Sequence, residues 1–387
     1  MKINIIIPSF YPAVVYGGPI FSSLNTSKEL AALDNVEVFV STTNTNMTSK
    51  LDVETNKYIE LENDLYVKYY NETIVGKFSL ALFLNIYKDI KQSDVVNIQA
   101  IFNTPVPISL LYAKLFQKPI LISTRGALCK WCIGQGNSFK QIWLNFFIKP
   151  FIKNVYWHAT CEAEKKDILN IFPEAKIVII PNGVDVKSYD VYNFLSKNEY
   201  MKKYIDKDVT PSHIIVSMSR LHAKKGFDIL IKSFVFVLEK FPDSVLLIAG
   251  PDEGEQKNLE NLIKDLKLEN QIYLVGSISN QDKIDFLANA DVFALPSHNE
   301  NFGNVYVESL ASGTPIVAST GTPWQEVEKE NCGKWVHNSV NETSIAILEM
   351  LKQDREVMRV NAKKLAKKYD WENIAVQFKE VFEKMVK

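Results

Sequence analysis

The feature that most constrains this chain is an alternation of short, continuous apolar runs with longer segments of helical periodicity. Short apolar runs separated by helices are typical of βαβ units, in which a parallel sheet is covered on both faces. In the first half, the helical patterns are Phe21–Leu33 and Pro107–Phe116. The strands expected there are Ile3–Ile7, Val36–Val40, Val95–Ile98, Pro119–Ile122, Tyr156–Ala159 and Ile177–Ile180.

The same alternation of apolar runs and helical segments resumes after Lys187–Pro211, a polar stretch with no clear β pattern. The strands expected in the second half are His213–Met218, Ser244–Ala249, Gln271–Leu274, Val292–Leu295 and Pro315–Ala318. The helices expected between them are Phe227–Lys240, Gln256–Leu266, Asp282–Ala288 and Asn304–Ala311.

These patterns predict two doubly wound, Rossmann-like α/β domains that cover residues 1–190 and 191–370 and face a central cleft. A length of 387 residues suits two domains. The amphipathic pattern of Asp370–Lys387 predicts a final helix, and we expect residues 371–387 to cross back to the first domain. Ligands of such sheets bind at the carboxyl ends of the strands, so we expect the active site in the cleft.

Composition excludes several classes of function. The formal net charge is −1, from 44 basic and 45 acidic residues. A chain that binds nucleic acid in general would be expected to carry an excess of positive charge. Four cysteines in 387 residues are not a disulfide framework and favour a reducing compartment. No apolar run reaches the roughly 18–20 residues of a membrane span, and the apolar run before Pro8 is too short for a signal peptide. A cytoplasmic location is therefore expected.

The strongest site signal is PSHNENFGNVYVESLASGTPIVAS, residues Pro296–Ser319. A strand ends before a polar loop with Glu300, and a helix that includes Glu308 begins after Gly303. The free amides of a helix N-terminus attract anions, and carboxylates accept hydrogen bonds from hydroxyl groups. The pattern suits a phosphorylated polyol such as a nucleotide sugar. A helix cap beside a solvated glutamate is the alternative.

The second signal is SMSRLHAKKGFDILIKSF, residues Ser217–Phe234. Arg220 and Lys225 lie on a strand-to-helix loop with Gly226, and no acid stands between them in the sequence. An arginine fork and a lysine point charge can converge on a diphosphate. The alternative is a solvated basic loop.

Together these segments resemble the retaining nucleotide-sugar glycosyltransferases of family 4, which have the GT-B fold. The order of the motifs along the chain carries the resemblance. They are Gly17-Gly18, Pro181-Asn182-Gly183-Val184-Asp185, Ser219-Arg220-Leu221 through Lys225-Gly226-Phe227-Asp228, Ala249-Gly250-Pro251, Val275-Gly276, and Glu300 with Glu308.

The resemblance implies a role for each matching position. Arg220 and Lys225 would hold the donor diphosphate, and Glu300 would contact the donor sugar. Glu308 would hold the ribose. The remaining donor contacts would come from Phe302, Gly303, Asn304, Gly276, Gly17 and Gly18. The family generally needs no divalent metal and no cofactor, and this chain lacks an Asp-x-Asp motif.

One departure concerns the segment directly after the expected strand Pro119–Ile122. Many family members carry a His-Asp pair there, whereas this chain has Ser123-Thr124-Arg125-Gly126. Arg125 could contact donor phosphate or acceptor, or could close the loop structurally. His158 could lie at the cleft edge and contact acceptor or donor, or could belong to a strand that precedes a helix capped by Thr160.

Two further patterns have competing interpretations. Cys129-x-x-Cys132 stands without a second ligand pair, so neither zinc nor redox chemistry is expected. In Phe139–Asn154 aromatic residues alternate with Lys140, Lys149 and Lys153. This pattern suits a peripheral membrane surface, or a core helix whose lysines reach solvent, with a break or kink at Pro150.

The resulting prediction is a retaining, metal-independent hexosyltransferase that uses a nucleoside-diphosphate sugar, with UDP first and GDP second. The acceptor would be a glycan or lipid-linked saccharide in surface polysaccharide synthesis, and the enzyme would be cytoplasmic or peripheral on the inner face of the membrane. The alternatives are a non-hydrolysing sugar-nucleotide epimerase and a non-catalytic partner subunit of the same fold. A dinucleotide oxidoreductase does not fit, because Gly17-Gly18 is not a G-x-G-x-x-G motif.

Overall fold

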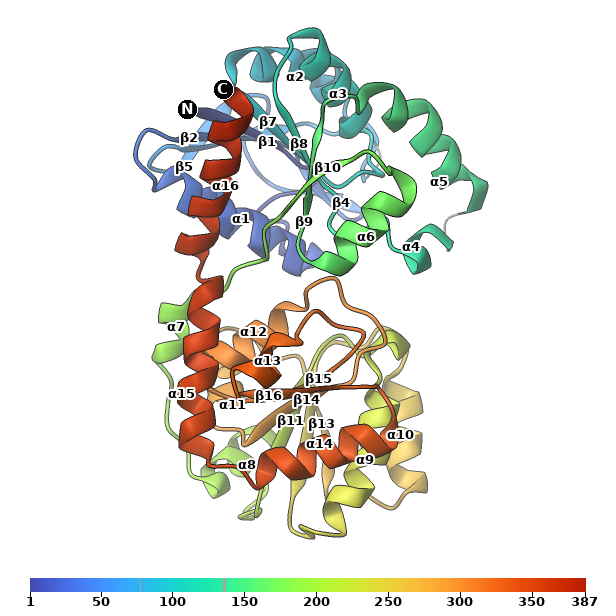
Figure 1. The fold of residues 1–387 in the computed structure, drawn as a ribbon, viewed down its shortest axis with the longest axis vertical. Coiled ribbons are helices and arrows are strands. Elements are labelled where there is room, and N and C mark those ends of the chain that lie inside the picture. The colour runs from blue at the N-terminus through green and yellow to red at the C-terminus, as the bar shows by residue number, and fades with distance from the viewer. Residues whose placement is uncertain (77, 135–136) are drawn as a thin grey trace. The chain divides into compact units, whose positions relative to one another are not determined.

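The computed structural model describes residues 1–76, 78–134 and 137–387. Contacts between Cα atoms divide the chain into two compact units. Unit 1 contains Met1–Gly183 together with Trp371–Lys387, and unit 2 contains Val184–Asp370. Each unit is a parallel-sheet α/β fold (Figure 1).

The sheet of unit 1 has the strand order β10-β9-β8-β7-β1-β2-β6-β5, parallel except for the β5–β6 pair. Its strands are β1 (Lys2–Ile6), β2 (Glu37–Thr43), β5 (Tyr58–Glu62), β6 (Leu65–Tyr70), β7 (Val95–Gln99), β8 (Ile120–Ser123), β9 (Tyr156–Ala159) and β10 (Lys176–Ile179). A small antiparallel pair, β3 (Thr45–Asn46) and β4 (Ser49–Lys50), stands apart from it.

Helices cover both faces of this sheet because alternate strand residues point in opposite directions. Ile120 and Ile122 join one apolar cluster, whereas Leu121 between them joins the other. The helical segments of unit 1 are η1 (Val14–Tyr16), α1 (Gly18–Ala31), α2 (Leu80–Gln92), α3 (Pro105–Leu115), α4 (Lys130–Gly134), α5 (Asn137–Trp143), the π-helix η2 (Leu144–Ile148), η3 (Lys149–Phe151), α6 (Glu162–Ile171) and α16 (Trp371–Val386).

The last helix, α16, packs beside α1 on one face of the unit 1 sheet (Figure 1). Its apolar side buries Ile374, Phe378 and Phe382 against that face. At the entry to α16, the Trp371 ring lies against Gly183, where an added Cβ would stand 2.4 Å from the ring. The final segment is therefore part of the unit 1 core.

The sheet of unit 2 is wholly parallel in the order β13-β12-β11-β14-β15-β16. Its strands are β11 (Ile214–Met218), β12 (Val245–Ala249), β13 (Ile272–Gly276), β14 (Val292–Leu295), β15 (Ile316–Ser319) and β16 (Gly333–Val336). Its helical segments are α7 (Val186–Asp190), α8 (Lys197–Ile205), η4 (Ala223–Lys225), α9 (Phe227–Leu238), α10 (Gln256–Asp265), α11 (Asn280–Ala288), α12 (Asn304–Ala311), α13 (Glu326–Lys329), α14 (Val340–Leu351), α15 (Arg355–Ala366) and η5 (Lys367–Tyr369).

The expected domain boundary at residues 190/191 is too late, because unit 2 begins at Val184. Val184 forms a β-bridge with Asp370, and Val184, Val186 and Tyr189 are buried in the unit 2 core. The polar stretch that follows is likewise an integral part of unit 2. Its helix α8 starts with a capping box at Ser196 and packs into the same core.

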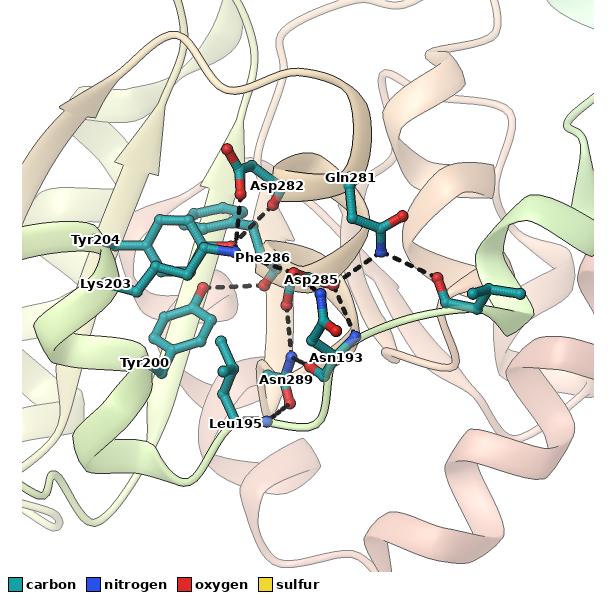
Figure 2. Close-up of polar contacts among 11 residues, drawn as sticks. Asn193, Leu195, Tyr200, Lys203, Tyr204, Gln281, Asp282, Asp285, Phe286 and Asn289 are labelled. Carbon is teal, nitrogen blue, oxygen red and sulfur yellow. Dashed lines mark hydrogen bonds and ion pairs between the residues drawn. The ribbon is translucent and has the colours of Figure 1, made fainter.

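A buried carboxylate fixes the segment between α7 and α8 to helix α11 (Figure 2). Asp285 accepts hydrogen bonds from the backbone and side-chain nitrogens of Asn193, each 2.9 Å away, and from Lys203 and Gln281. Burial opposes ionisation, but these donors lower the pKa of Asp285 to about 2. Charge-assisted hydrogen bonds to Asp285 therefore hold the segment between α7 and α8 in place, and its polar composition did not predict them.

Candidate active site

Two loops of unit 2 meet where adjacent strands β11 and β14 end. Gly226 has a φ of +70°, and a Cβ at this position would lie 2.2 Å from the carbonyl oxygen of Pro296. The backbone amide of His298 donates to the Lys224 carbonyl oxygen at 2.9 Å. Glycine is required here because both the backbone conformation and the close approach exclude a side chain.

This contact brings Lys225 and Glu300 together. The Lys225 ammonium forms an ion pair with Glu300, and the two side chains are only 12% and 13% exposed. Ser297 donates to the same carboxylate oxygen at 3.1 Å, and the Glu300 amide donates to Gly321 at 2.9 Å. Two residues 75 positions apart thus form one buried, polar unit.

Arg220 lies on the β11–η4 loop with its side chain 63% exposed. Its guanidinium pairs with Glu253 at 2.5 Å. No acid stands between Arg220 and Lys225 in the sequence, and the acid that pairs with Arg220 comes instead from the neighbouring loop after β12. A β-bridge between Leu221 and Asp252 holds the two loops together.

Gly303 caps helix α12 in a left-handed conformation, with a φ of +77°. The α12 N-terminus, with Gly303 and Asn304, follows the Glu300 loop as expected. Phe302 is buried against Trp324 and Tyr369, and its carbonyl oxygen accepts the Trp324 indole N–H at 2.8 Å. The Phe302 carbonyl is thus engaged in packing the loop, and the contact of Phe302 with the donor stays a prediction.

Glu308 lies in α12 and pairs with Lys283 of α11 at 2.9 Å. Both side chains keep partial exposure, 20% for Glu308 and 26% for Lys283. The Lys283 ammonium also lies 5.8 Å from the centre of the Tyr189 ring. Burial, with the Glu308 charge as a further cause, raises the pKa of Tyr189 well above its usual value.

Gly250 and Gly276 shape the neighbouring strand ends. A Cβ on Gly250 would lie 1.8 Å from the Ser219 carbonyl oxygen, so this glycine permits the β11 and β12 loops to approach. The Gly250 amide donates to Gly276 at 2.8 Å. Gly276 has a φ of +75°, is exposed, and has open space where a Cβ would be.

The structure therefore places Arg220, Lys225 and Glu300 in the connections that follow the strands of unit 2, Gly276 at the end of β13, and Glu308 within α12. Gly17 and Gly18 belong to unit 1, where Gly17 precedes α1 with a φ of +68° and open space where a Cβ would be. Sequence reasoning missed the counterions Glu253 and Lys283. Neither has a spacing signal, because each meets its partner across separate loops or helices.

Arg125 points into a polar network of unit 1. Its guanidinium donates to Gln99 at 2.6 and 3.0 Å and to Asn182 at 3.1 Å, with a longer contact to Ser23. Burial lowers the pKa of Arg125 to about 10. Of the two interpretations of Arg125, these contacts favour the structural one, because its hydrogen bonds join the loop after β8 to three other segments.

His158 is 2% exposed, so its placement at the edge of a cleft is wrong. Its Nδ1 lies 2.9 Å from the Ser123 hydroxyl, and its Nε2 lies 2.7 Å from the Ile180 carbonyl oxygen. Nε2 therefore carries the proton and donates to Ile180, while Nδ1 accepts from Ser123. Phe378 of α16 packs on the ring edge, so His158 is a satisfied core histidine.

The helix after β9 also differs in detail from the expectation. Its N-cap is Cys161, and not Thr160. The Glu164 carboxylate reaches back to accept from Thr160 and also binds Thr124 and the Gly126 amide. Burial opposes the charge, but these hydrogen bonds keep the pKa of Glu164 below its usual range.

We expect acid to destabilise unit 1 through His158. Burial, and then the nearby Arg125 charge, lower its pKa to about 4 from the usual 6.5. As pH falls from about 6.5 to 4, His158 becomes protonated in the unfolded chain but stays neutral in the folded chain. The free energy of unfolding should fall by roughly 3 kcal/mol over this range. Calorimetric unfolding of wild type and His158→Gln at several pH values measures this slope.

The informative quantity is how steeply the free energy of unfolding changes with pH. Its absolute value is less informative, because His158→Gln also loses packing. The Glu164 contribution is present above the unfolded pKa and is lost as pH falls through its lowered folded pKa, so it acts at the acid end of the range. An unchanged slope between pH 6.5 and 5 in His158→Gln would show that another group titrates there.

The two remaining sequence patterns also have defined positions. Cys129 and Cys132 are both half-buried, and within residues 1–76, 78–134 and 137–387 no cluster of three His, Cys, Asp or Glu has the arrangement of a metal site. Phe139–Asn154 is not one regular helix, but passes from α5 through a π-helical turn and a 3₁₀ turn at Pro150. No helix in the described part of the chain is long and apolar enough to cross a membrane.

Solved structures that also contain two α/β units define the class of the fold. HepE of Anabaena, determined with UDP, superposes with a TM-score of 0.75 at 19% identity over 99% of this chain and all of that one. A glycosyltransferase from Rickettsia africae superposes with a TM-score of 0.73 at 20% identity, over 100% and 98% of the two chains. The fold is GT-B, with two Rossmann-like domains.

Sequence models identify the family. The model for "Glycosyltransferase Family 4" matches residues 16–188, and the model for "Glycosyl transferases group 1" matches residues 202–369. The chain belongs to the family-4 glycosyltransferases.

Two curated relatives are more similar in sequence than these structures. An uncharacterised glycosyltransferase of Methanocaldococcus jannaschii is 31% identical over 56% of this chain and 57% of its own length. The GDP-mannose-dependent monoacylated alpha-(1-6)-phosphatidylinositol monomannoside mannosyltransferase of Corynebacterium glutamicum is 34% identical over 44% and 46%. The chain thus matches about half the length of these relatives.

Proposed function

We propose that the protein is a retaining glycosyltransferase that moves a sugar from a nucleoside diphosphate to a hydroxyl group. The observation that carries this proposal is the buried Lys225–Glu300 pair at the ends of adjacent strands β11 and β14. It combines a cation suited to a diphosphate with a carboxylate suited to sugar hydroxyls. Arg220, on the same loop as Lys225, supplies the second cation.

In this proposal Arg220 and Lys225 provide the positive charge that would otherwise come from a divalent metal, and no cofactor takes part. The bond between the anomeric carbon and the diphosphate oxygen breaks, and the acceptor oxygen bonds to that carbon from the same face. The acceptor proton passes to the leaving phosphate oxygen. The chain contributes orientation and stabilisation of the charge that develops on the diphosphate.

The remaining residues would bind the parts of the donor that do not react. Glu308 would accept hydrogen bonds from the ribose, and the Gly303 and Asn304 amides would face the sugar and phosphate. UDP remains the first choice of nucleotide, supported by the UDP in the HepE structure. GDP is the second, supported by the name of the Corynebacterium relative.

A thermal-shift screen with UDP, GDP and their sugars, followed by donor hydrolysis, tests the function. Nucleotide binding with slow release of free sugar is the expected result. An epimerase would instead return an isomerised nucleotide sugar, and a non-catalytic subunit would release no sugar. Either outcome would contradict the proposal.

The same proposal includes peripheral association with an anionic membrane, in keeping with a glycan or lipid-linked acceptor and a role in surface polysaccharide synthesis. Between Asp94 and Glu162 the sequence has no Asp or Glu, but has six lysines and one arginine. Within this stretch, α5 and η2 expose Phe139, Ile142, Phe146 and Phe147, the set that we call the aromatic face. Leu144 and Ile148 of η2 are fully buried.

Exposed aromatic rings flanked by lysines favour an anionic bilayer, where each lysine contributes about 1 kcal/mol that salt screens. We therefore expect wild type to sediment with vesicles that contain phosphatidylglycerol at low salt and to be released at high salt. Phe146→Ser/Phe147→Ser should reduce the bound fraction at least about tenfold.

The matched control for this pair is Phe83→Ser/Leu84→Ser on α2. The control residues are 43% and 56% exposed, compared with 69% and 45% for Phe146 and Phe147. If the control pair loses binding equally, or if wild type stays in solution, the aromatic face does not bind membrane. Lys149→Glu/Lys153→Glu should shift release to lower salt.

A further inference from the structure

Unit 2 contains a cavity of about 300 Å³ at the amino edge of its sheet. Ala288 and Asn289 line this cavity, and both precede strand β14. The residues of unit 2 proposed to bind the donor lie at or beyond the carboxyl ends of its strands, so the cavity is at the opposite edge of the same sheet. Its volume is at the lower end of the range of about 300–1,000 Å³ that is typical of small-molecule sites.

The charged side chains of this cavity are mostly cationic. Its wall contains Lys197, Arg355 and Arg359, with Glu356 as the one acid. Asp291, which is not part of the wall, pairs with Lys197 at 3.3 Å and with Arg355 at 3.0 Å. Two cations therefore share one carboxylate. With Asp291 and Glu356 both counted against the three cations, the site keeps an excess of one positive charge.

Arg359 has no carboxylate partner in the described part of the chain. Its guanidinium donates to the Tyr192 hydroxyl and, at 3.5 Å, to the Ala288 carbonyl oxygen. The Arg359 Cζ atom lies 4.9 Å from the centre of the Tyr192 ring. The aliphatic stem packs on Gly313, where an added Cβ would lie 2.7 Å from Arg359 Cγ. The guanidinium is thus held in place, and most of its five N–H donors are available to an anion.

An exposed aromatic ring also lines the cavity. Phe194 is 83% exposed, although both of its neighbours in the chain are held by Asn289. The Leu195 amide donates to the Asn289 side chain, which in turn donates to the Asn193 carbonyl oxygen, each at 2.9 Å (Figure 2). Asn289 is only 6% exposed, so these anchors are buried. The backbone therefore keeps the Phe194 ring at the surface, where a planar group of a ligand can pack on it.

From this combination we propose that the cavity binds an aromatic phosphate monoester, a small ligand that carries a phosphate group beside a planar ring. The phosphate oxygens would accept hydrogen bonds from Arg359, while Arg355 and Lys197 add positive charge. The ring would pack on Phe194 in an offset or edge-to-face geometry. This site goes beyond the proposed glycosyl transfer, because it shares no residue with the proposed donor site.

A purely structural role accounts for Arg355 but not for the other features of the cavity. Arg355 donates to the Ala290 carbonyl oxygen at 3.0 Å and pairs with Asp291, so it connects α15 to the end of α11. The contact of Arg359 with Ala288 is longer, at 3.5 Å, and leaves its charge uncompensated. Helix packing also gives no reason for an exposed ring at Phe194. Arg359 and Phe194 are therefore the residues to test.

The test compares phenyl phosphate with methyl phosphate, the matched probe without a ring. Phosphorus NMR line widths measure the binding of each probe to the full chain. Phenyl phosphate should bind wild type at least about tenfold more tightly than methyl phosphate, because only its ring can pack on Phe194. Arg359→Gln should weaken phenyl phosphate at least about tenfold, because it removes a charged donor. Phe194→Ser should lower the affinity of phenyl phosphate to that of methyl phosphate.

Two control variants locate the bound probe. Phe236→Ser removes a ring that is 45% exposed on α9, and it should change the affinity of neither probe. Lys225→Ala removes a cation of the proposed donor site and should also leave both affinities unchanged. Phe194→Ser keeps the test decisive if Arg359→Gln unfolds, because the Phe194 side chain packs on little of the fold.

Three results would overturn the proposal. The first is equal affinity of wild type for the two probes, or no binding of either. The second is a folded Arg359→Gln variant, or a Phe194→Ser variant, that binds phenyl phosphate like wild type. The third is loss of phenyl phosphate in Lys225→Ala, which would place the probe in the donor site. Failure of glycosyl transfer with an intact pattern of phenyl phosphate binding would instead refute the proposed function alone.

Discussion

Lys225→Ala is expected to lower turnover by on the order of 100-fold or more. The change removes a charged donor to the leaving diphosphate, and losing one such contact costs about 3 kcal/mol in the transition state. It also leaves Glu300, only 13% exposed, without its ion-pair partner. Single-turnover release of nucleotide from the sugar donor measures the effect without interference from product release.

Arg220→Ala should show a loss of similar size. Because the Arg220 side chain is 63% exposed, its removal should leave the thermal midpoint unchanged. Lys232→Ala is the matched control, since Lys232 lies in the following helix α9 and pairs with Asp228 on the same helix at 3.3 Å. Near wild-type turnover in either Lys225→Ala or Arg220→Ala would show that the diphosphate binds elsewhere.

Glu300→Gln is expected to reduce kcat more strongly than Glu308→Gln when donor is saturating. Glu300 would touch the sugar that reacts, whereas Glu308 would touch the ribose and act through donor binding. Glu308→Gln should therefore raise KM while kcat changes little. Steady-state kinetics of both variants with one donor gives the comparison.

The structure offers a control for the loss of a paired carboxylate. Glu349 of α14 pairs with Lys334 at 2.6 Å, and neither residue belongs to the proposed donor site. Glu349→Gln should leave both kcat and KM unchanged. Equal losses of kcat in Glu300→Gln and Glu308→Gln would contradict the division between the reacting sugar and the ribose.

Most of the fold could be predicted because its central strands are buried on both faces and so appear as uninterrupted apolar runs. Tyr156–Ala159 and Val292–Leu295 have the predicted bounds, as does the helix Asn304–Ala311. The missed strands lie towards the sheet edges. In β5 (Tyr58–Glu62), three consecutive residues are exposed, so the run shows no apolar signal. In β16 (Gly333–Val336), only the first residue is buried.

The site was predictable to the extent that strand ends determine it. Arg220, Lys225 and Glu300 follow β11 and β14, and adjacent parallel strands bring such loops together. The pairing of Arg220 with Glu253, and of Glu308 with Lys283, depends on loop and helix packing that has no fixed spacing. For His158 the sequence suggested a site residue where the structure has a core residue. A histidine at a strand end can equally find hydrogen-bond partners for both ring nitrogens within the core.

The return of α16 to unit 1 has a consequence for how the chain folds as the ribosome produces it. Residues up to Gly183 emerge first, but the face that α16 covers still lacks Ile374, Phe378 and Phe382. All of unit 2 is translated before this face can be closed, so a nascent unit 1 exposes an apolar surface throughout that interval. Such a surface is a natural target for chaperones, and a chain released before Trp371 would be prone to aggregate.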